Sequence, residues 1–146
     1  MKEALLISEC LLGAACRYDG RSKPLEPDAL EKLSARYALI PVCPEQLGGL
    51  PTPRPPAERG PDGVRNASGE SVTAQFCRGA AETLRISAFF GCKKALLKSR
   101  SPSCGSDEVY DGSFTGTLRP GDGVTAEALK ANGVAVYGEG ELDKLL

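Results

Sequence analysis

Cysteine is the residue type in this sequence that is best suited to chemistry. The chain of 146 residues contains no histidine and six cysteines, which are Cys10, Cys16, Cys43, Cys77, Cys92 and Cys104. Histidine is the usual general base and the usual neutral metal ligand, so acid–base work here falls to carboxylates, thiols, hydroxyls or amines. In a reducing compartment, six thiols indicate metal or redox chemistry more than disulfides.

The spacing of the cysteines leaves the kind of chemistry open. No C-x-x-C pair occurs, and five residues separate Cys10 from Cys16, so the usual ferredoxin and zinc-ribbon patterns are both absent. Soft thiolate ligands select iron–sulfur clusters, zinc or copper(I). From the pattern alone, metal or cluster binding and buried structural thiols are equally good interpretations. Cys77 and Cys92 are predicted to be small buried hydrophobic residues in or beside a helix.

Three of the cysteines follow short apolar segments that are typical of buried strands. These segments are EALLIS (3–8) before Cys10, ALIPVC (38–43) ending at Cys43, and KALLKS (94–99) before Cys104. Apolar residues at helical spacing, with their flanking prolines and glycines, predict three helices. The predicted helices span about 27–36, 72–90 and 124–131, and a fourth strand (134–137) and a final helical turn (141–146) follow.

Strands that alternate with helices predict an α/β fold. We expect a single-domain, Rossmann-like three-layer sandwich over residues 1–146, with a mainly parallel sheet of about four strands. Ligands of such sheets lie beyond the carboxyl ends of the strands. One edge of the sheet would therefore bring Cys10, Cys43 and Cys104 together. Three thiolates without a fourth protein ligand suit a [4Fe-4S] cluster that has one open iron.

Proline and glycine dominate the segment that follows Cys43. Residues 44–63 contain six prolines and four glycines, which predict a long surface loop without regular structure. Loops of this length in a domain are often functional. We expect residues 46–56 to cover the edge of the sheet that carries the cysteines. A second segment, 110–123, is rich in turn residues.

Three longer segments carry a resemblance to a known family. SECLLGAACRYDG (8–20), PVCPEQLGGLPTPRPP (41–56) and LKSRSPSCGSDEVYDGSFTG (97–116) resemble the signature blocks of the thiouracil desulfidase family. The resemblance implies an enzyme whose [4Fe-4S] cluster is held by three cysteines, with one iron free of protein ligands. It also implies that a thiolated uracil is converted to uracil by non-redox hydrolysis, with release of sulfide.

The same resemblance implies site residues. The implied cluster ligands are Cys10, Cys43 and Cys104, and Cys16 either lines the site or replaces one of them. Glu45 and Ser101 are the implied catalytic residues: the carboxylate would activate water, and the hydroxyl would bind the pyrimidine edge or hold that water.

Plainer interpretations of these side chains stay open. Glu45 after a proline is typical of a helix or turn cap, and Ser101 and Ser103 are typical of turns whose hydroxyls bond backbone groups. Ser103 and Arg17 are predicted to line the site. Three roles are open for the basic residues of the same segments: balancing the charge of an anionic cluster, binding a nucleotide phosphate, or remaining solvated at the surface. These residues are Arg17, Arg54, Lys98 and Arg100.

Charge and hydrophobicity limit the classes of binding partner and the cellular location that we expect. The net charge of −1 argues against general binding to nucleic-acid backbones, so a small molecule is the expected partner. The family resemblance implies that this molecule is a thiopyrimidine, as free base or nucleoside. Nucleic acid is expected only as the carrier of a thiolated base. No apolar run approaches the ~20 residues of a membrane span, and the first residues lack a secretion signal, so we expect a cytoplasmic protein.

Two other classes of protein remain alternatives, and the oligomeric state is left open. One is a non-enzymatic iron–sulfur or zinc module in which the metal stabilises a small fold. The other is a thiol redox protein that uses Cys10 and Cys16.

Overall fold

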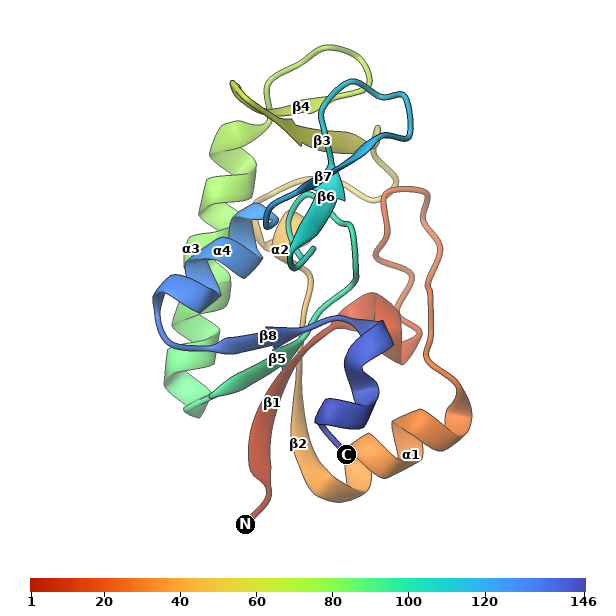
Figure 1. Ribbon diagram of the computed structural model, residues 1–146, viewed down its shortest axis with the longest axis vertical. Coiled ribbons are helices and arrows are strands. Elements are labelled where there is room, and N and C mark those ends of the chain that lie inside the picture. The colour runs from red at the N-terminus through yellow and green to blue at the C-terminus, as the bar shows by residue number, and fades with distance from the viewer.

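A parallel sheet of four strands forms the centre of the protein, and the computed structural model describes all residues, 1–146. The strands lie in the order β2-β1-β5-β8, and each neighbouring pair is parallel (Figure 1). Their bounds are β1 (Glu3–Ser8), β2 (Tyr37–Val42), β5 (Lys94–Leu96) and β8 (Ala135–Tyr137). The predicted α/β class and the predicted sheet of about four strands are confirmed.

Alternation along the central strand divides the core into two apolar layers. Leu5 and Ile7 of β1 pack in the layer on one face of the sheet, and Leu6 between them packs in the layer on the other face. All three side chains are fully buried. A strand that is covered on both faces is apolar along its whole length, which is why this segment shows no polar alternation.

Helices cover both faces of the sheet, as a three-layer sandwich requires. The long helices are α1 (Pro27–Arg36), α3 (Thr73–Phe90) and α4 (Val124–Ala131), and the short ones are η1 (Glu9–Leu12), α2 (Pro44–Leu47) and η2 (Glu139–Lys144). Leu33 of α1 packs in the layer that contains Leu5, whereas Leu129 of α4 packs in the layer that contains Leu6. Helices α3 and α4 lie together on that second face (Figure 1). No helix is long and apolar enough to cross a membrane.

Residues 44–63 were predicted to lack regular structure, and that prediction is wrong; the turn-rich segment 110–123 also contains a short strand. Residues 44–63 include α2 and β3 (Ala57–Gly60), and β3 pairs antiparallel with β4 (Gly63–Asn66). In the segment 110–123, β7 (Leu118–Pro120) pairs with β6 (Glu108–Tyr110). Pro44 occupies the first turn of α2, where proline is tolerated, and the other prolines lie outside the paired positions or at strand ends. Both pairs of strands lie beyond the carboxyl ends of the sheet, at the top of Figure 1.

Two glycines allow α2 to lie directly on α3. A Cβ atom at Gly79, in the middle of α3, would overlap the carbonyl oxygen of Pro44, and one at Gly48 would overlap the carbonyl oxygen of Gln75. Glycine in a helix interior costs about 1 kcal/mol relative to alanine, so close backbone contact is the reason for Gly79. This contact fixes the position of α2 at the end of β2.

Candidate active site

The order of the strands reverses beside β1, and the ends of two strands are joined there. The chain passes from β1 to β2 on one side, whereas β5 and β8 lie on the other side. Ser8, the last residue of β1, accepts a hydrogen bond from the backbone N–H of Lys98 at 3.0 Å. Its hydroxyl also lies 3.5 Å from Sγ of Cys104, to which it donates. Such a switch point is where ligands bind in open α/β sheets.

A cavity of about 570 Å³ opens at this switch point. It is lined by the loops that follow β1, β2 and β5, and by residues of the segment between α2 and β4 such as Arg54 and Pro56. Four buried thiols face it, those of Cys10, Cys16, Cys43 and Cys104. All eight residues predicted for the site line this cavity, since Arg17, Glu45, Ser101 and Ser103 join the four cysteines.

Local backbone structure holds the first two thiols. Cys10 lies in η1, where its carbonyl oxygen accepts hydrogen bonds from the N–H groups of Gly13 and Lys23. Gly13 ends this short helix with φ of +104°, a conformation that favours glycine. The carbonyl of Cys16 accepts from Nη2 of Arg54 at 3.0 Å and from the thiol of Cys43 at 3.8 Å. The first cysteine loop is therefore bonded to the loop that follows β2.

Close backbone packing fixes the loop that carries Cys104. A Cβ atom at Gly105 would lie 2.7 Å from the carbonyl oxygen of Ser101, and one at Gly123 would collide with the backbone of Ser103. The first turn of α4 also donates to this loop, because the N–H groups of Thr125 and Ala126 bond the Ser103 carbonyl. The tight, serine-rich loop is therefore held between the end of β5 and the start of α4.

Three thiols of the cavity, those of Cys16, Cys43 and Cys104, have a raised pKa and so hold their protons tightly. Burial raises the pKa of Cys104 to about 11, against the lowering effect of the Ser8 and Ser103 hydroxyls. Hydrogen bonding with Cys10 raises the pKa of Cys16 to about 11, and hydrogen bonding with Cys16 raises that of Cys43 far above its ordinary value. A reactive redox thiol has a lowered pKa, so the raised pKa of Cys16 argues against the thiol redox alternative. Metal binding would instead displace the protons.

The donor set fits an iron–sulfur cluster. The thiols of the cavity are soft donors, which such clusters prefer. In a cluster each protein sulfur binds a different iron, and cysteines that come from three separate loops agree with that arrangement.

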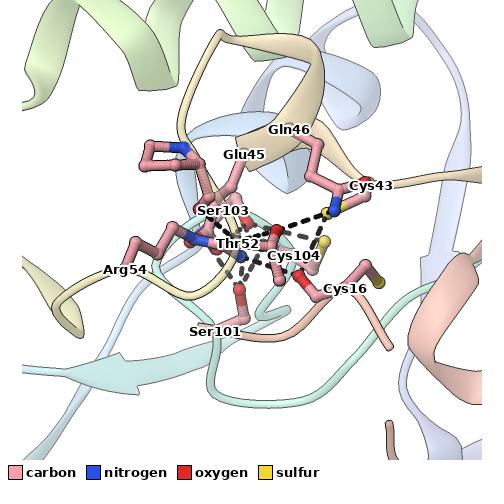
Figure 2. Close-up of polar contacts among 10 residues, drawn as sticks. Cys16, Cys43, Glu45, Gln46, Thr52, Arg54, Ser101, Ser103 and Cys104 are labelled. Atoms are coloured by element: carbon pink, nitrogen blue, oxygen red, sulfur yellow. Dashed lines mark hydrogen bonds and ion pairs between the residues drawn. The ribbon is translucent and has the colours of Figure 1, made fainter. Parts of the chain in front are cut away.

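Glu45 is one of three carboxylates that line the cavity, with Glu9 and Glu58, and its partners come from two loops (Figure 2). Its Oε1 accepts from Nε of Arg54 at 3.0 Å, and its Oε2 accepts from the Ser103 hydroxyl at 2.9 Å. The side chain makes no capping bond at the start of α2, so the interpretation as a helix cap is wrong. Only 15% of the Glu45 side chain and 5% of the Arg54 side chain are exposed.

Arg54 has a structural role that the sequence did not predict. Besides Glu45 and the Cys16 carbonyl, it bonds the Pro51 carbonyl at 3.2 Å and Oγ1 of Thr52 at 3.1 Å through Nη1. Every nitrogen of its guanidinium group is thus engaged. Its place between prolines was the available signal, because such a backbone leaves few N–H groups and relies on side-chain donors.

Ser101 reaches Glu45 only through Ser103. Its Oγ accepts from the N–H groups of Ser103 and Cys104 at 3.2 and 3.1 Å, the pattern typical of a turn serine. The two hydroxyl oxygens lie 3.0 Å apart (Figure 2), and the Ser103 hydroxyl donates to Glu45. Ser101 therefore donates to Ser103, and a continuous chain of hydrogen bonds runs from Ser101 to the carboxylate.

The two remaining cysteines lie outside the cavity. Cys92 is buried, as predicted. Cys77 is exposed, so its prediction is wrong. Phe76 and Ala80 form the buried stripe of α3, and Cys77 lies one residue, or about 100°, away from Phe76 around the helix.

Comparison with known proteins identifies the family. The model of the 2-thiouracil desulfurase family matches residues 5–141 of the chain. The chain belongs to this family. The resemblance carried by the three sequence blocks is thereby confirmed. Among solved structures, the [4Fe-4S]-dependent thiouracil desulfidase TudS superposes with a TM-score of 0.94 at 46% identity, over 99% of this chain and 95% of TudS. The present chain is also 40% identical to YbbK of Bacillus subtilis (strain 168), over 97% of this chain and 99% of YbbK.

Proposed function

We propose that this protein is an iron–sulfur-dependent desulfidase that removes sulfur from a thiolated pyrimidine by non-redox hydrolysis. The observation that carries the proposal is the position of Glu45, a buried carboxylate that faces the same cavity as four cysteine thiols. Family membership and the likeness to TudS support the activity and the cofactor.

Cys10, Cys43 and Cys104 would hold a [4Fe-4S] cluster through one thiolate from each of three loops. When bound, the cluster would supply one iron free of protein ligands, a Lewis acid that draws charge from the substrate sulfur. Cys16 lines the same cavity and is the fourth candidate ligand. Ser8 would donate a hydrogen bond to the Cys104 sulfur, at 3.5 Å, and stabilise its thiolate form.

Glu45 would act as the general base toward water. Each of its oxygens has one hydrogen-bond donor in the structure, from Arg54 or Ser103, and so keeps a lone pair for a water molecule. The carboxylate would take a proton as the water oxygen attacks the carbon that bears sulfur. In the balanced reaction, the thiocarbonyl group and one water molecule become a carbonyl group and one hydrogen sulfide, without oxidation or reduction.

The cavity is large enough for a pyrimidine with an attached sugar. Arg17, Lys23 and Arg100 line it and form no ion pair, unlike Lys98, which pairs with Glu139 at 2.9 Å. The substrate would be the free base or the nucleoside, with a nucleic acid only as the carrier of the same base. The protein would act as one domain, residues 1–146, in the cytoplasm, where thiols stay reduced.

Isotope labelling under anaerobic conditions tests this function. The iron-loaded protein is incubated with 2-thiouracil or 4-thiouracil in water enriched in oxygen-18. We expect one labelled uracil and one sulfide for each thiouracil consumed. Comparison of kcat/KM for the bases and their nucleosides then sets the substrate preference. Unlabelled uracil, or uracil without sulfide, contradicts hydrolysis.

A further inference from the structure

A loop at the mouth of the cavity presents an exposed aromatic ring. Phe114 lies in the loop between β6 and β7, is 41% exposed and lines the cavity together with Tyr18 and Tyr110. Its φ of +58° is uncommon for a residue with a side chain. Such a strained conformation persists only where the surroundings impose it.

Glu58 imposes this conformation from the neighbouring strand. Its Oε1 accepts from the N–H of Gly112 at 3.0 Å and from the N–H of Phe114 at 3.1 Å. Glu58 belongs to β3, where it pairs with Arg65 of β4, so the carboxylate is supported by a regular hairpin. One carboxylate oxygen thus binds the backbone on both sides of Ser113.

The same loop is fixed at two further points. A Cβ atom at Gly112 would lie 2.7 Å from Cα of Gly60, so the loop touches the backbone of the β3–β4 hairpin. Asp111 accepts from the Ser113 N–H at 2.9 Å, and the Asp111 N–H donates to the Thr117 carbonyl. The backbone that carries Phe114 is therefore held in place at the mouth of the cavity, where the ring is partly exposed.

We propose that Phe114 determines substrate specificity by stacking on the pyrimidine ring, and that Glu58 positions it. This inference rests on the proposed function, because it takes the substrate to be a planar heteroaromatic base. Exposed aromatic side chains stack on nucleobases through their π faces, and the contact also removes apolar surface from water. A ring that is already held in its binding position loses little entropy when the base arrives.

Binding of uracil to the iron-loaded protein tests the inference without turnover. Calorimetric titration with uracil should show a dissociation constant about 5- to 150-fold higher for Phe114→Ala than for the wild type. Phe114→Tyr keeps the aromatic face and should stay close to wild type, whereas Phe114→Leu should resemble alanine. With thiouracil, KM should rise in the alanine variant while kcat changes little. Phe89→Ala is the matched control, because Phe89 is 82% exposed at the far end of α3 and does not line this cavity.

A double-mutant cycle separates positioning from general structural support. Glu58→Ala should weaken uracil binding like Phe114→Ala, and the double variant should be no weaker than either single variant. Iron content should be equal in all of them. If the wild type desulfurises thiouracil but Phe114→Ala binds uracil as tightly as the wild type, this inference alone is overturned. A wild type that neither binds uracil nor releases sulfide overturns the proposed function and this inference with it.

Discussion

Arg54 donates from Nε to Oε1 of Glu45 over 3.0 Å, and the pair is almost completely withdrawn from solvent. The same guanidinium bonds the Cys16 carbonyl. One side chain therefore fixes both the carboxylate that would activate water and the loop of a cavity cysteine. Planar, forked donors of arginine suit such a site, and lysine cannot replace them.

Replacement of Arg54 by lysine should slow turnover while the charge is kept. A single ammonium group cannot bond Glu45, the Cys16 carbonyl and the Pro51 carbonyl together, so the carboxylate should lose its fixed orientation. We expect turnover per cluster to fall by about 10²-fold, the size typical of misplaced catalytic groups. Sulfide release per iron measures it. Arg85→Lys is the control, since that side chain is 76% exposed. Equal turnover in Arg54→Lys would show that Glu45 needs no fixed partner.

Replacement of Glu45 by glutamine should leave the protein brown and nearly inactive. Glutamine keeps the shape but cannot accept a proton, and loss of a general base costs about 10²–10⁴-fold in rate. Iron content should match the wild type, because Glu45 bonds no cysteine. Turnover per cluster close to that of the wild type would exclude this carboxylate as the base and direct attention to Glu9, Glu58 or Cys16, which line the same cavity.

Replacement of Gly79 by alanine should damage the site from a distance. The added methyl group would overlap the Pro44 carbonyl and push α2 away from α3, moving Cys43 and Glu45 with it. Overpacking of this kind costs about 1–3 kcal/mol, even though alanine is the better helix former. We expect a lower unfolding temperature and a lower iron content. Ala74→Gly is the control, because it exchanges the same two residue types in the opposite direction at an exposed position of the same helix. Unfolding at or above the wild-type temperature in Gly79→Ala would refute the close contact.

Glu139 should contribute an acid-sensitive part of the stability. Burial alone would raise its pKa, but the Lys98 ammonium and the N–H of Ser99 together hold the pKa of this carboxyl below its usual value. The ionised form is thus preferred in the folded state, so this stability is present above pH ~4.5 and is lost as the pH falls further. Glu139→Gln should lower the free energy of unfolding at pH 7 by about 1–2 kcal/mol and flatten its fall in acid. Thermal unfolding at several pH values measures both effects, with the cluster in the same state in both proteins. A parallel fall in variant and wild type would contradict the assignment.

Patterns along the sequence predicted those helices and strands whose formation depends on residues that are close together in the chain. The apolar segments at 3–8 and 38–43 and the spacing along 72–90 identify buried strands and a helix, and the sheet then brings the strand-ending cysteines to one edge. Short elements that depend on distant partners were missed. Helix α2 needs the bare backbone of Gly79, and β3 needs β4 to form at all.

The candidate site likewise has residues that the sequence predicted and contacts between them that it did not. The family blocks led to Glu45 and Ser101, but the partners of a side chain are set by loops that meet only in the folded chain. The bonds of Arg54 to Glu45 and Cys16 join three separate segments, and no spacing in the sequence encodes them. Likewise, the order Ser101–Ser103–Glu45 follows from hydroxyl geometry that the sequence S-P-S-C leaves open.

Iron content and sulfide release, measured together after anaerobic purification, test the central claim most directly. The wild type should contain about four irons per chain, be brown and release sulfide from thiouracil. Alanine at Cys10, Cys43 or Cys104 should lower the iron content and abolish sulfide release, whereas alanine at Cys77 or Cys92 should do neither. Full cluster retention in Cys43→Ala would move that ligand to Cys16. A wild type that releases sulfide equally well without iron, or that binds only colourless zinc, would contradict the account.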